Sequence, residues 1–147
     1  MNDYKNYIEQ LSWKNSEKEQ SEAIEILSKS EDWDFTNCIR NSSKDIWENL
    51  VVVINRRSYQ DKVKLADDLI YLLMDLNWPG ALQGLEILKS LKKEVIQAPL
   101  EDTLYSAYVD RDGNWISNLF ELIKYFKFSD SDFTKVKLAD VVSLREW

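Results

Sequence analysis

The sequence of 147 residues contains no histidine, a single cysteine, three glycines and two prolines. Histidine is the commonest general base and the commonest metal ligand of proteins, so its absence removes both roles. Three glycines and two prolines are too few for the many turns of a β-sandwich or barrel. The lone Cys38 excludes an intrachain disulfide and is typical of a reducing cytosol, so a cytoplasmic location is predicted.

Long hydrophobic runs are also missing. No apolar stretch approaches the ~20 residues that a helix needs to span a bilayer. The first ten residues, MNDYKNYIEQ, are polar and predict no signal peptide. Cations are the scarcer charge, with 19 Lys and Arg against 26 Asp and Glu and a net charge of -7. An acidic surface disfavours nucleic acid and anionic membranes as partners and favours a basic protein.

Apolar side chains at helical spacing are abundant. Residues 50–54 are rich in β-branched side chains and could form a strand, but no second strand candidate exists to pair with them, so a helix is favoured. Residues 31–40 fit a turn and then a short helix or irregular segment. The segment from Phe133 onward fits either a helix or an extended chain. The predicted helices span 4–13, 17–27, 44–57, 62–76, 79–91, 99–109 and 114–126.

Polar residues at the predicted helix ends indicate how the helices start and stop. Ser16 and Glu19 form a capping-box pattern at the start of the second helix. Gly113 suits a left-handed turn after the helix that begins at Pro99, and Asn114 suits the cap of the next helix.

The stretch 62–91 organises the rest of the chain, because it reads as two helices joined by a tight corner. Pro79 cannot continue the first helix, but it suits the first turn of the second. Asn77 is expected to cap that second helix, and Trp78 is expected to fold into the core between the two. Together with Trp47 and Trp115, Trp78 and Pro79 are predicted to be structural residues.

Repetition points to stacked hairpins. Trp33, Trp78 and Trp115 recur roughly 40 residues apart, a period typical of two-helix repeats. The hexapeptide KVKLAD occurs twice, at 62–67 and at 135–140. The sequence therefore predicts an all-α fold of stacked helical hairpins, HEAT- or TPR-like, with about six to eight helices. A single domain, 1–147, is predicted, made of N-terminal helices (1–43), a HEAT-like core (44–128) and a C-terminal segment (129–147).

The segments WENL at 47–50, LLMDLNWPGA at 72–81 and NW at 114–115 carry a resemblance. Over 44–126 the chain resembles a family of small bacterial HEAT-like α-helical domains of unknown function, related to immunity proteins encoded beside secreted polymorphic toxins. The resemblance implies a helical stack and a toxin as partner. It brings no catalytic residues with it.

One motif is similar to a calcium-binding loop. Asp110, Asp112, Asn114 and Glu121 occupy the oxygen-ligand positions of an EF-hand. The sixth position of such a loop requires Gly for its sharp turn, and here it is Trp115. A helix end, a turn and a new helix are therefore favoured, and no metal site is predicted.

Other candidates for chemistry are weaker. The carboxylates Asp67, Asp68, Asp75 and Glu86 are interpreted as solvated outer faces of amphipathic helices. Cys38 has no histidine to activate it as a nucleophile. Neither an enzyme nor a cofactor is predicted.

Binding is the remaining class of function. Basic residues cluster only at 56–57 and 89–93, without the interleaved aromatics that single-strand binders use. A toxic nuclease is basic, so an acidic helical protein could cover it. The predicted function is thus that of an immunity protein that occludes a cognate toxin; the alternative is a cytosolic helical-repeat adaptor without a toxin. The oligomeric state is left open. The predicted partner-binding residues are the acidic groups expected at corners and outer faces: Glu31, Asp32, Asp34, Asp75, Glu101, Asp102, Asp110 and Asp112.

Overall fold

The computed structural model describes residues 4–144, and within them all regular structure is helical. The predicted all-α stack of helical hairpins is confirmed, with nine α-helices in this part of the chain against the six to eight expected. Residues 1–3 of the predicted N-terminal helices and 145–147 of the predicted C-terminal segment lie outside the described residues. The α-helices are α1 (Tyr4–Gln10), α2 (Glu17–Lys29), α3 (Lys44–Arg56), α4 (Tyr59–Lys64), α5 (Ala66–Tyr71), α6 (Ala81–Lys89), α7 (Lys93–Val109), α8 (Gly113–Phe126) and α9 (Leu138–Val142).

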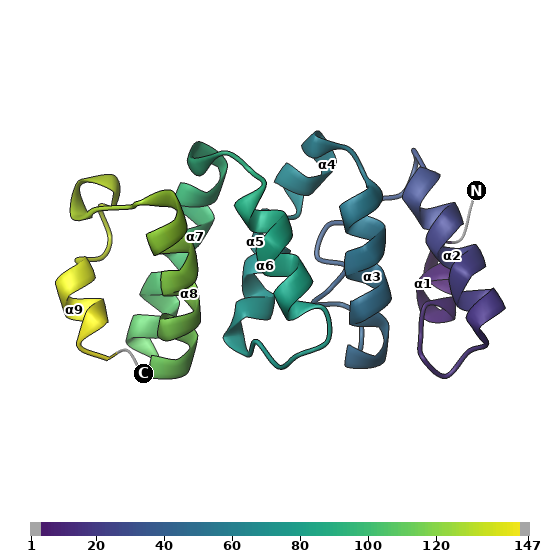
Figure 1. Cartoon of the computed structure of the whole chain (residues 1–147), viewed down its shortest axis with the longest axis horizontal. Coiled ribbons are helices and arrows are strands. Elements are labelled where there is room, and N and C mark those ends of the chain that lie inside the picture. The colour runs from purple at the N-terminus through teal and green to yellow at the C-terminus, as the bar shows by residue number, and fades with distance from the viewer. Residues whose placement is uncertain (1–3, 145–147) are drawn as a thin grey trace.

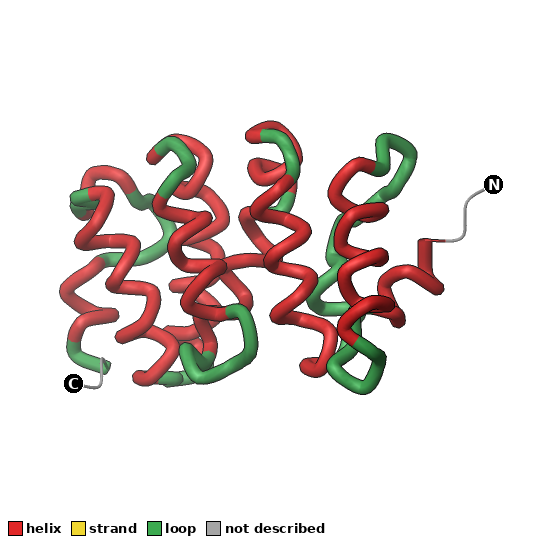
Figure 2. The backbone as a smooth tube through the Cα atoms, turned by 45° about the vertical axis from the view of Figure 1, so that its right-hand side comes forward, coloured by secondary structure: helices red, strands yellow, loops and turns green. Residues whose placement is uncertain are grey.

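The longer helices stand side by side in two layers (Figure 1). Helices α2, α3, α6 and α8 form one layer, and α1, α5 and α7 lie behind them. Across the two layers, α1 pairs with α2, α5 with α6 and α7 with α8. α3 has no regular helix behind it, because the segment between α2 and α3 is mostly loop (Figure 2). α9 lies at the far end of the stack from α1.

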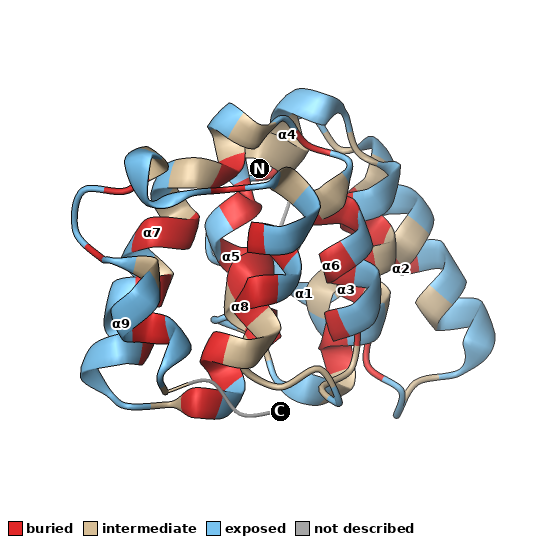
Figure 3. Cartoon of the chain, turned by 60° about the vertical axis from the view of Figure 1, so that its left-hand side comes forward, coloured by how far each residue is buried: buried red, intermediate tan, exposed pale blue. Residues whose placement is uncertain are grey.

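The core forms because the longer helices bury their apolar sides between the layers (Figure 3). In α3, the buried residues recur along one side and include Leu50, Val53 and Ile54, all at 0% exposure. This confirms the helical interpretation of 50–54. Burial against α2 and α6 outweighs the modest intrinsic preference of β-branched residues for strands.

The central stretch 62–91 is more broken than predicted. Its first helix is interrupted at Leu65, which separates α4 from α5, and it ends in a 3-10 turn, Leu72–Met74. The N-cap of α6 is Gly80 rather than Asn77, and Pro79 precedes the helix instead of lying in its first turn. The reason is a close approach: Gly80 has φ 83°, and a Cβ there would lie 2.8 Å from Val51 Cγ2.

The predicted start of α7 at Pro99 is also wrong. The helix begins at Lys93, not at Pro99, and Pro99 lies inside it. Proline costs one helical hydrogen bond, but Ile96 and Leu100 on either side of it are fully buried. Their burial holds the helix together across the missing bond.

The corner between α7 and α8 uses different residues from those expected. Arg111, with φ 52°, takes the left-handed conformation, while Gly113 is the first residue of α8. Asp112 rather than Asn114 caps the helix, because its Oδ1 accepts the Trp115 N–H at 3.0 Å. Asp112, which occupies a ligand position of the calcium-loop pattern, is therefore a helix cap. Between residues 4 and 144, no group of three or more His, Cys, Asp or Glu side chains is placed to hold a metal ion.

No described helix is both long and apolar enough to cross a membrane.

The Ser16 cap of α2 is confirmed, since its hydroxyl accepts the Glu19 N–H at 3.1 Å. At the other end of the chain, the ambiguous segment after Phe133 contains the short helix α9.

Candidate partner-binding groove

The eight carboxylates predicted to bind a partner do not gather on one surface. Glu31, Asp32 and Asp34 follow α2, at one end of the upright helices, whereas Asp75, Asp110 and Asp112 lie in corners at the opposite end (Figure 1). Glu101 and Asp102 lie on α7 in the rear layer. These groups therefore form no single acidic patch.

Two of these carboxylates accept hydrogen bonds within their own turns. Asp34 Oδ1 accepts the Thr36 N–H at 3.1 Å. Hydrogen bonds from the side chain and the backbone of Thr36 lower the pKa of Asp34. Asp75 Oδ1 accepts the Asn77 N–H at 2.8 Å. Asp and Asn commonly close turns in this way. Their position at the corners is explained locally, without a partner.

The prediction that Glu101 faces a partner is wrong, because its side chain is buried. Its Oε2 accepts the Thr134 N–H at 2.6 Å and also the Lys135 N–H. A buried carboxylate is tolerated when backbone N–H groups satisfy it. Glu101 thus fixes the C-terminal segment against α7.

We expect Glu101→Ala to release this segment, because two backbone N–H groups lose their acceptor at a cost of about 1–3 kcal/mol. Amide hydrogen exchange should speed up in 134–142 while α3 and α6 stay protected. Asp102→Ala is the matched control, since Asp102 makes only an exposed ion pair with Lys135. Equal effects of the two variants would contradict the role given to Glu101.

The predicted position of Asp68 on a solvated helix face is also wrong. Its side chain is buried; Oδ2 accepts the Ile39 N–H at 2.6 Å, and Oδ1 lies 3.3 Å from Arg40 Nε. Burial raises the pKa of Asp68, while the Ile39 N–H and Arg40 oppose the rise. Asp68 anchors the irregular segment between α2 and α3 to α5.

Cys38 lies beside Asp68 and is buried. Burial raises the pKa of its thiol, and the nearby Asp68 carboxylate raises it further. A thiol with a raised pKa is a poor nucleophile at neutral pH. Cys38 is therefore a small apolar residue of the core.

Asp68 gives a testable pH dependence. Its pKa is higher in the folded than in the unfolded chain, where it is about 3.9. As the pH rises above about 4, the unfolded chain loses this proton first, so the contribution of Asp68 to stability falls toward neutral pH. We expect the stability of wild type relative to Asp68→Asn to decrease between about pH 4 and pH 7 in urea titrations.

The quantity to compare is the difference in free energy of unfolding between wild type and Asp68→Asn. Carboxylates with a lowered pKa, such as Asp45, contribute stability that is lost on acidification, but they do so equally in both proteins. The charged and titratable neighbours of Asp68 are Arg40, Asp67 and Cys38. Asp67→Asn, at the exposed preceding position, is the control. A wild-type-minus-Asp68→Asn difference that stays constant across this range would refute the assignment.

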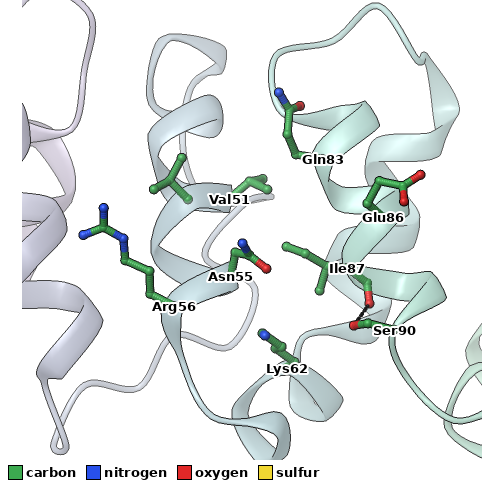
Figure 4. Close-up of a pocket in the computed structure, with 9 residues that line it drawn as sticks. Val51, Asn55, Arg56, Lys62, Gln83, Glu86, Ile87 and Ser90 are labelled. Atoms are coloured by element: carbon green, nitrogen blue, oxygen red, sulfur yellow. Dashed lines mark hydrogen bonds between the residues drawn. The ribbon is translucent and has the colours of Figure 1, made fainter.

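A groove of about 390 Å³ runs between α3 and α6. The two helices touch where Gly80 packs against Trp47 and Val51, and the groove follows along the next turns of both. Val51, Val52 and Ile87 form its apolar lining, and Lys62 of α4 lies at one end (Figure 4). The groove is open to solvent between two helices of the same layer.

Two amide side chains face solvent on opposite walls of this groove. Asn55 comes from α3 and Gln83 from α6, and both are exposed (Figure 4). Neither makes a hydrogen bond to any residue between 4 and 144. By contrast, Asn49 of α3 is used internally and donates to Leu11 O at 2.7 Å. The groove therefore presents free donors and acceptors beside an apolar lining.

The charged side chains around the groove differ in whether they have an ion-pair partner. Arg56 points away toward α2, where its Nη1 lies 3.2 Å from Glu25 Oε1 (Figure 4). Glu86 lies 3.6 Å from Lys89 Nζ. Within the described part of the chain, Lys62 has no carboxylate at ion-pair distance. Lys62 is thus the free charge of the groove.

The sequence pattern does not predict this groove. Asn55, Lys62 and Gln83 look like ordinary exposed positions of amphipathic helices, and their juxtaposition depends on how α3, α4 and α6 meet. Aromatic rings from other parts of the fold lie beside the basic cluster at 89–93, although none is interleaved with it in the sequence. Lys89 Nζ lies 5.5 Å from the Tyr125 ring centroid and Lys93 Nζ 4.9 Å from that of Phe128.

Comparison with known proteins returns no match among family models, curated proteins or solved structures.

Proposed function

We propose that this protein is an immunity protein, which binds a cognate secreted bacterial toxin and neutralises it by covering its active site. The observation that carries the proposal is the α3–α6 groove, with its free amides and free lysine on an exposed helical face. Unsatisfied polar groups around an apolar lining are typical of binding sites. The net charge of -7 supports a basic partner, because opposite charges speed encounter.

Neutralisation by binding is favoured over neutralisation by catalysis. The thiol of Cys38 is buried, and its pKa is raised. The buried carboxylates Asp68 and Glu101 already accept backbone N–H groups. The side chains most suited to chemistry thus hold the fold together, while Asn55, Gln83 and Lys62 of the groove have no side-chain partner among residues 4–144.

Co-expression tests the proposal. The toxin candidate is the variable C-terminal domain of a large secreted protein encoded next to this gene. We expect that domain alone to arrest growth, and co-expression of this chain to restore growth and yield a one-to-one complex on size-exclusion chromatography. Growth arrest that persists with the chain well expressed and no complex formed would contradict the proposal and favour an adaptor role.

A further inference from the structure

We propose that the α3–α6 groove receives an extended peptide segment of the partner, and that a carboxylate of this segment binds Lys62. This inference rests on the proposed function, because it gives the chemistry of what the groove binds. Its basis is the pattern of free and satisfied groups around the groove rather than the groove volume.

The two amides favour an extended occupant. A primary amide offers two N–H donors and one acceptor oxygen, which complement the C=O and N–H groups of a peptide backbone. Asn55 and Gln83 approach from opposite walls and have no partner of their own within residues 4–144. A helical occupant has already satisfied its own backbone, so free backbone C=O and N–H groups for both amides come from an extended segment.

The dimensions limit the segment to a few residues. The lining runs from Val51 to Arg56 on α3, and from Gln83 on α6 to Ser90, the residue that caps this helix. At 1.5 Å rise per residue these stretches are roughly 8–10 Å long, which is the length of about three extended residues. The apolar lining of Val51, Val52 and Ile87 fits one short aliphatic side chain of such a segment.

The charges determine the chemistry at the Lys62 end. Arg56 pairs with Glu25, and Glu86 lies close to Lys89. Arg56 and Glu86 therefore need no opposite charge from a partner. Lys62 has no such neighbour in the described chain. A carboxylate placed there completes the pairing, and either an Asp or Glu side chain or the C-terminus of a chain supplies it.

A peptide library provides the probe. Twelve-residue random peptides are displayed in two formats, one with a free C-terminus and one without, and selected on the folded wild-type protein. We expect enriched peptides to carry a carboxylate next to a short aliphatic residue. Each is then resynthesised, and its affinity measured by fluorescence anisotropy; changing its Asp or Glu to the amide, or amidating its C-terminus, distinguishes the two sources of the carboxylate.

Variants of the protein locate the binding. We expect the double variant Asn55→Ala with Gln83→Ala, and separately Lys62→Glu, to weaken binding at least tenfold. The matched controls are Gln60→Ala with Asn114→Ala, which removes two exposed amides elsewhere, and Lys64→Glu on the same helix α4. These should bind like wild type, and circular dichroism melts confirm that every variant is folded.

The outcomes separate this inference from the proposed function. A library that enriches no peptide, or peptides bound equally well by Lys62→Glu and Lys64→Glu, overturns the inference. Growth rescue by the groove variants as complete as by wild type also overturns it, but leaves the immunity role intact. Peptide binding in the groove without any rescue by wild type supports the inference and contradicts the immunity role.

Discussion

Replacing Trp47 with Ala is expected to lower the free energy of unfolding by about 4 kcal/mol, the usual cost of removing a buried tryptophan. Trp47 is 5% exposed and packs edge-on against Trp78, with 5.3 Å between the ring centroids. Its Nε1–H donates to Ile39 O at 2.8 Å and to Ser42 O at 3.1 Å. The substitution therefore creates a cavity and also releases the irregular segment between α2 and α3 from Trp47.

Urea titration followed by circular dichroism measures this loss. Trp13→Ala is the control, because Trp13 is 51% exposed and its removal should cost less than about 0.5 kcal/mol. Trp78, which was expected in the core, is only partly buried, so Trp78→Ala should fall between the two. Equal destabilisation by Trp47→Ala and Trp13→Ala would contradict the packing described here.

Replacing Gly80 with Ala is expected to lower the free energy of unfolding by about 3 kcal/mol. A left-handed conformation costs a residue with a Cβ about 1–2 kcal/mol, and overpacking adds about 1–3 kcal/mol. Both apply here, since φ is 83° and the new Cβ would lie 2.8 Å from Val51 Cγ2 and 3.2 Å from Trp47 O. The backbone oxygen cannot move aside without shifting α3.

Gly84→Ala is the control for this prediction. Gly84 lies inside α6, and its nearest neighbour would be Leu72 Cδ1 at 3.3 Å, the flexible end of a side chain. Alanine also favours a helix interior by up to about 1 kcal/mol over glycine, so we expect a change within about 1 kcal/mol. Val51→Ala should recover part of the Gly80→Ala loss in a double-mutant cycle. A Gly80→Ala protein as stable as wild type would contradict the close contact of α3 and α6.

The helices themselves were predictable because the apolar pattern is local. The spacing of apolar residues in α3 and α8, and the Ser16 cap of α2, depend only on neighbours in the sequence. The errors occur where distant segments decide. Pro99 continues a helix because residues on both sides of it are buried, and Gly80 replaces Asn77 as a cap because α3 lies against it.

The candidate site was less predictable than the fold. An exposed carboxylate at a corner and one that closes its own turn have the same sequence signature, as Asp75 illustrates. Asp68 and Glu101 look like surface residues but accept N–H groups from segments about thirty residues away. Among the described residues, the side chains of Lys62 and Asn55 have no partner because of how α3, α4 and α6 are spaced. The sequence pattern does not specify this spacing.

We propose that this protein neutralises its partner by stoichiometric binding. The most direct test of this claim is a titration of the purified toxin domain with the purified protein, following residual toxin activity. We predict a linear fall that reaches zero at one molecule of protein per molecule of toxin, with activity returning when the complex is dissociated. Complete and lasting inactivation at a small fraction of one equivalent would indicate turnover, and would contradict the claim.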